Sequence, residues 1–155
     1  MEKLPNKLSD CIEIALKDLK KIEADPRYAV GMHPTWHTGR RSNLPGDRCC
    51  VCFAGAVMAK TLDCNIDDNI SPYELGPYQY GDLHADERIH NGCRLEALDQ
   101  ARAGHISSAL FSTYKKVPEH YNGPREVFVT PYGMSSDEFV KDMNGIVELL
   151  REYNL

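Results

Sequence analysis

An uninterrupted run of eleven uncharged residues at positions 49–59 (CCVCFAGAVMA) constrains the fold of this chain more than any other segment. It contains three of the six cysteines and leaves no polar face if it is wound into a helix. Asp47 precedes the run and is a suitable N-cap residue. We therefore predict a helix over about residues 48–62 that is enclosed by the rest of the protein, with five side chains largely buried: Cys52, Phe53, Ala56, Val57 and Met58.

Length and charge narrow the class of protein. The 155 residues suit a single domain (1–155), and a net charge of −5 argues against a general grip on nucleic acid. No apolar leader follows Met1, and no apolar run approaches the roughly 18 residues that a membrane span requires. We therefore expect a cytoplasmic protein without a membrane partner. In that reducing compartment the cysteines are expected to remain thiols.

Hydrophobic periodicity predicts a mainly α fold of about five to six helices with long loops. Besides the cysteine helix, we expect helices over residues 6–24, from Asp82 or Asp86 to Gly104, and over 106–117. A last helix should begin at a capping box formed by Ser135 and Glu138. Alternating residues predict short strands near Tyr28 and over 126–130, which would pair in one two-stranded β element.

The cysteine segment allows a catalytic interpretation. A thiol at a helix N-terminus is favoured as a thiolate, and Cys49 or Cys50 would occupy that position. A histidine base is also needed, and His33 and His37 in the preceding loop are candidates. The alternative is that the cysteines are small residues of the core.

Two sets of residues match metal-ligand spacings. His33 and His37, together with Cys49 and Cys52, would supply four zinc ligands. A second set occupies the ligand positions of an EF-hand-like calcium loop: Asp63, Asn65, Asp67, Asn69, Ser71 and Glu74. Asp68 stands where such a loop needs glycine, and Gly76 and Pro77 prevent a long exiting helix. We therefore expect no bound metal and no other cofactor.

Two loops of opposite charge suggest a protein-binding surface. Seven acidic residues and no lysine or arginine lie between positions 61 and 87, whereas the preceding loop is rich in arginine. Tyrosine and tryptophan in both loops are typical of interfaces. The alternative is that the loops face each other or are simply solvated. The candidate partner-binding residues are Trp36, Arg40, Arg41, Asp67, Asp68, Tyr78 and Tyr80.

Three stretches carry a resemblance to known proteins: residues 28–37 (YAVGMHPTWH), 50–62 (CVCFAGAVMAKTL) and 95–110 (LEALDQARAGHISSAL). They resemble small proteins encoded by bacteriophages and prophages, a group with no assigned activity. The resemblance implies an accessory protein in the cytosol of an infected bacterium and implies no catalytic residues. Our leading hypothesis is a non-enzymatic protein that binds a host or phage protein. A cysteine hydrolase or transferase, and a zinc- or calcium-binding protein, are the alternatives.

Overall fold

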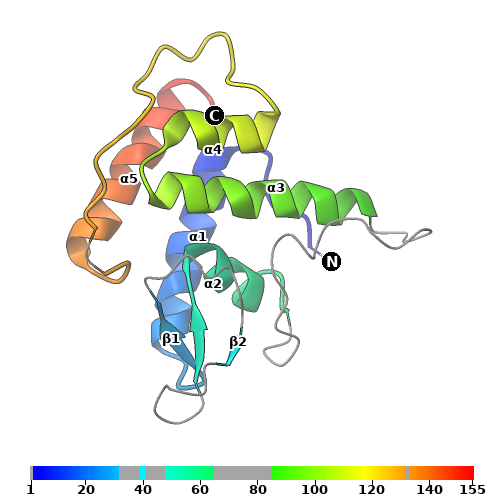
Figure 1. Ribbon diagram of the computed structural model, residues 1–155, viewed down its shortest axis with the longest axis vertical. Helices are drawn as coiled ribbons and strands as arrows, with labels where there is room; N and C mark the ends of the chain where they lie inside the picture. Colours follow the sequence, from blue (N-terminus) through cyan, green and yellow to red (C-terminus); the bar gives the residue numbers. More distant parts are fainter. Residues whose placement is uncertain (1, 32–38, 41–47, 65–84, 132) are drawn as a thin grey trace.

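The helices and strands confirm a mainly α architecture (Figure 1). The computed structural model describes residues 2–31, 39–40, 48–64, 85–131 and 133–155. In chain order the elements of the described residues are α1 (Leu8–Glu23), β1 (Tyr28–Val30), β2 (Gly39–Arg40), β3 (Cys49–Val51), α2 (Phe53–Lys60), α3 (Ala85–Arg102), α4 (Ile106–Tyr114) and α5 (Asp137–Glu152). The strands lie at one end of the molecule and α4 at the other.

Helix α1 is the element around which the core is built. It packs against α2, α3 and α5, and its buried stripe is the one that the sequence predicts. Helix α5 also buries its predicted stripe, and its N-cap is Ser136 rather than Ser135. The Ser136 hydroxyl accepts a hydrogen bond from the Phe139 N–H at 3.1 Å, so the cap is displaced by one residue from the predicted capping box.

The cysteine run is divided between a strand and a helix, which corrects the prediction of one helix over 48–62. Cys49 and Cys50 belong to β3, and α2 begins only at Phe53. Cys52 is the N-cap in place of Asp47, and its sulfur accepts from the Gly55 N–H at 3.4 Å. A buried strand and a buried helix are both uniformly apolar, so periodicity alone does not separate them. The five side chains predicted to be buried are all buried.

The sheet has three strands in the order β1-β3-β2. Strand β1 is parallel to β3, with Tyr28 opposite Cys49, and β2 is antiparallel to β3. The predicted pairing of Tyr28 with the segment around Val129 is therefore wrong. Residues 126–130 are extended but bind elsewhere, because the Val127 N–H donates to the Gly104 carbonyl and the Thr130 N–H donates to Asp142.

Helix α3 buries polar side chains where an apolar stripe was expected. Ile89, predicted to face the core, is 41% exposed, whereas Asn91 is fully buried. The Asn91 amide accepts from the Leu4 N–H at 2.9 Å and donates to the Glu2 carbonyl at 2.8 Å. The N-terminal segment thus packs along α3, and its backbone is satisfied by side chains of that helix.

Candidate functional site

The structure places the proposed nucleophiles in a strand, where no helix N-terminus acts on them. Cys49 is fully buried and Cys50 is half-buried in β3. The Cys50 sulfur packs over Gly31, since a Cβ atom added to that glycine would lie 2.0 Å from it. The helix terminus is instead occupied by Cys52, and burial raises the pKa of this thiol. The predicted electrostatic activation of Cys49 or Cys50 is therefore wrong.

The histidines that the structure describes interact with groups away from β3. Their partners are the Leu4 carbonyl for His90 at 2.7 Å, Glu126 for His105 at 3.6 Å, and the Tyr153 carbonyl for His120 at 3.1 Å. His33 and His37, the histidines proposed as bases, lie outside the described residues. Their pairing with Cys49 or Cys50 stays a prediction.

The two metal hypotheses depend mostly on residues outside the described part of the chain. Of the zinc set, only Cys49 and Cys52 are described, and Cys52 is already used as a helix cap. Of the calcium set, only Asp63 is described; it is exposed, with a left-handed backbone (φ 51°). Within the described residues, no group of three or more His, Cys, Asp or Glu side chains is arranged to hold a metal ion. Both hypotheses remain predictions.

The predicted partner-binding loops are also largely outside the described residues. Trp36, Arg41, Asp67, Asp68, Tyr78 and Tyr80 all fall there, as do the remaining calcium candidates Asn65, Asn69, Ser71 and Glu74. Arg40 is described through its backbone in β2, which pairs with Cys49. The described residues must therefore be examined for surfaces that the sequence did not single out.

One charged cluster is structural in character. The Asp25 carboxylate accepts from Arg27 through two nitrogens and from Lys60 at 2.6 Å. Hydrogen bonds from Arg27 and then from Lys60 hold the pKa of Asp25 well below its usual range. The two cations also lie over the ring of Tyr28, at 5.4 Å and 5.0 Å. These contacts join the end of α1 to β1 and α2, and every charge in the cluster is paired.

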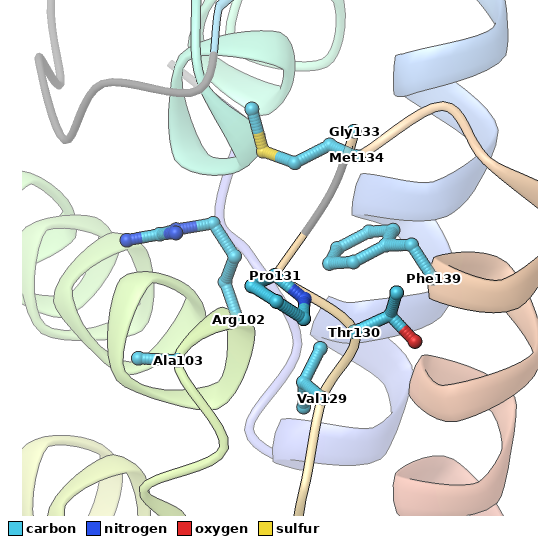
Figure 2. Close-up of a pocket in the computed structure, with 8 residues that line it drawn as sticks. All are labelled: Arg102, Ala103, Val129, Thr130, Pro131, Gly133, Met134 and Phe139. Atoms are coloured by element: carbon cyan, nitrogen blue, oxygen red, sulfur yellow. The ribbon is translucent and has the colours of Figure 1, made fainter.

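A depression of about 220 Å³ lies between the end of α3, the segment before α5 and the first turn of α5 (Figure 2). Its walls are mostly apolar. The lining residues are Arg102, Ala103, Val129, Thr130, Pro131, Gly133, Met134 and Phe139. Figure 2 shows the guanidinium of Arg102 directed away from Pro131 and Phe139, and it binds Asp99 at 3.2 Å.

The polar groups of this depression are engaged in holding its walls. The Thr130 N–H and hydroxyl both donate to one oxygen of Asp142, at 2.7 Å and 2.6 Å. These two bonds lower the pKa of Asp142 and tie the 129–131 segment to α5. What remains accessible is an apolar surface formed by Val129, Pro131 and Met134 with the Phe139 ring behind them.

An exposed aromatic side chain adjoins the depression. Phe128 is 81% exposed, whereas its neighbours Val127 and Val129 are half-buried against the core. Alternation along the extended segment thus turns Phe128 outward. The sequence analysis identified the alternation of residues 126–130 and assigned it to a strand. The alternation itself was the available signal for an outward aromatic residue.

No family model, curated protein or solved structure matches this chain. Function must therefore be argued from the residues themselves. Of the helices among the described residues, none is both long enough and apolar enough to cross a membrane.

Proposed function

We propose that this chain is a non-enzymatic accessory protein that binds another protein, and that the depression beside Phe128 receives an apolar side chain of that partner. The observation that carries the proposal is the 81% exposure of Phe128 next to an apolar depression. Exposed aromatic residues beside apolar hollows are typical anchors of protein interfaces.

The size of the depression favours a side chain over a cofactor. Pockets for small-molecule ligands usually measure about 300 to 1,000 Å³ and carry converging polar groups. This depression measures about 220 Å³, and the polar groups of Arg102 and Thr130 are engaged with Asp99 and Asp142. One aliphatic or aromatic side chain of a partner would fill most of it.

Charge beside the depression suggests what flanks that side chain. Asp137 and Glu138 are exposed in the first turn of α5, directly before Phe139. The whole chain carries a net charge of −5. A partner segment with lysine or arginine next to its apolar anchor would therefore be attracted to this surface. The resemblance to phage and prophage proteins places such a partner in the cytosol of a bacterium.

Selection from a displayed library of random peptides tests the proposal directly. The purified protein should enrich peptides that carry an aromatic or large aliphatic residue beside lysine or arginine. Binding of the enriched peptides should fall at least about tenfold for Phe128→Ser, a loss of about 1.4 kcal/mol. It should also weaken when Asp137 and Glu138 are replaced by their amides.

Phe111 supplies a matched control, because it is 58% exposed on α4. Phe111→Ser removes a comparable exposed ring from a different element and should leave peptide binding unchanged. Equal loss for the two variants would show a general stickiness of exposed aromatic residues. Enrichment of no peptide family, or of one indifferent to Phe128→Ser, would contradict the proposal.

A further inference from the structure

A lysine amine and a cysteine sulfur make an unusually close contact on the surface formed by α3 and α4. The Nζ atom of Lys115 lies 2.8 Å from the Sγ atom of Cys93. The other two printed contacts of thiols with hydrogen-bonding groups, Cys11 with the Pro5 carbonyl and Cys52 with the Gly55 N–H, are both 3.4 Å. The Lys115 amine therefore approaches its sulfur much more closely than these backbone groups do.

The backbone at Lys115 gives an independent reason to ask what this side chain does. Lys115 is the C-cap of α4 and has a left-handed conformation, with φ 62° and ψ 2°. Glycine and asparagine are favoured at such positions, because the Cβ atom of other residues is crowded there. A lysine in this conformation is a backbone outlier, and such outliers are found preferentially at functional sites.

The surroundings allow both access and positioning. Helices α3 and α4 pack directly against each other, so the two side chains are held by rigid elements. Cys93 is half-buried and Lys115 is exposed, so a small oxidant has access to the sulfur. The two residues are 22 positions apart, and a bond between them would join the middle of α3 to the end of α4.

We propose that Cys93 and Lys115 form an oxidative modification site, at which hydrogen peroxide links Sγ to Nζ through one bridging oxygen. The first peroxide oxidises the thiol to a sulfenic acid and releases one water. After the ammonium has lost a proton to solvent, a second peroxide removes one hydrogen from the sulfenic acid and one from the amine, joins the oxygen to Nζ and releases two waters. Overall, one S–H and one N–H bond break, one S–O and one N–O bond form, and both peroxides are reduced to water.

The separation of the two atoms favours the oxygen bridge over other products. An oxygen bonded to both atoms would keep them near their present distance, so the helices need not move. A direct bond between sulfur and nitrogen would require the atoms to come much closer together. A four-electron reduction by a dithiol such as dithiothreitol would restore the thiol and the amine, which makes the modification reversible.

Treatment of the folded protein with hydrogen peroxide, followed by mass spectrometry, tests the proposal. The expected product gains one oxygen and loses two hydrogens, and proteolysis yields one species that contains the peptides of Cys93 and Lys115 joined. Dithiothreitol should separate them. Because the link closes a loop, the oxidised protein should also melt about 6 to 12 °C higher than the reduced protein.

Three variants make the result specific. Lys115→Gly suits the left-handed backbone and removes the amine, and Lys115→Arg keeps a cation; neither should form the joined species. Lys116→Arg changes the adjacent lysine and should leave the cross-link unaffected. If wild-type Cys93 gains only whole oxygens, as in Lys115→Arg, or stays unmodified while other thiols are oxidised, the proposal is wrong.

Discussion

Replacement of Phe53 by alanine should destabilise the protein by about 3 to 5 kcal/mol. Phe53 is the first residue of α2, and its side chain is fully buried. Its ring meets that of Phe139 edge to face, with centroids 5.7 Å apart and an interplanar angle of 88°. The substitution removes this contact and leaves a cavity where β3, α2 and α5 meet.

The magnitude follows from the size of the side chain and from the contact. Burial and cavity formation account for most of the loss, and an edge-to-face aromatic pair contributes about 0.5 to 1.5 kcal/mol. Domains are stable by about 5 to 15 kcal/mol, so the variant would lose a large share of the total. At about 2 to 4 °C per kcal/mol for a chain of this length, the melting temperature should fall by about 6 to 20 °C.

Urea unfolding followed by circular dichroism measures the effect. Phe128→Ala is the control, because its 81% exposed ring should change the unfolding free energy by less than about 0.5 kcal/mol. A double-mutant cycle of Phe53 with Phe139 should give a coupling energy of about 0.5 to 1.5 kcal/mol. A loss below about 1 kcal/mol for Phe53→Ala would refute the placement of α2 in the core.

Three further predictions concern local structure and pH. Ser136→Ala should cost about 1 kcal/mol in an unfolding titration, whereas Ser135→Ala should cost almost nothing, because only the first hydroxyl caps α5. Gly104→Ala should destabilise by more than about 1 kcal/mol, since φ is +82° and the added Cβ would lie 2.0 Å from the Val127 carbonyl oxygen. Gly145→Ala, in open space on α5, should instead stabilise by about 0.5 to 1 kcal/mol. Burial raises the pKa of the Cys11 thiol from 9.0 to about 12, so the unfolded chain loses this proton first. Unfolding free energy should therefore fall as pH rises above about 9, and less steeply for Cys11→Ala; equal slopes for the two proteins would contradict the burial of this thiol.

Sequence periodicity identified the helices whose one face is apolar. The stripes of α1 and α5 repeat at helical spacing, so their buried faces could be predicted from local pattern alone. It failed where burial leaves no pattern, as in the run from Cys49 to Ala59, where a strand precedes the helix. It also failed at Asn91, because the backbone that this polar side chain satisfies lies 87 and 89 residues away.

Partners distant in the chain limited the prediction of the sites in the same way. The alternation at 126–130 indicated an extended segment with Phe128 outward, but gave no sign that α3 and α5 would complete a depression beside it. The contact between Cys93 and Lys115 depends on the packing of α3 against α4 and on a left-handed helix end. Neither feature is visible in local composition.

The thiol of Cys50 offers a direct test of packing against catalysis. It lies in the central strand, opposite Ala29 and Gly39, with its sulfur over Gly31. If packing is its role, Gly31→Ala should destabilise by about 1 to 3 kcal/mol, since the added methyl would meet the sulfur at 2.0 Å. Cys50→Ala in the same chain should recover most of that loss, because it removes the atom that clashes. If the double variant is no more stable than Gly31→Ala, the sulfur is not what occupies this space, and packing against Gly31 would not account for Cys50.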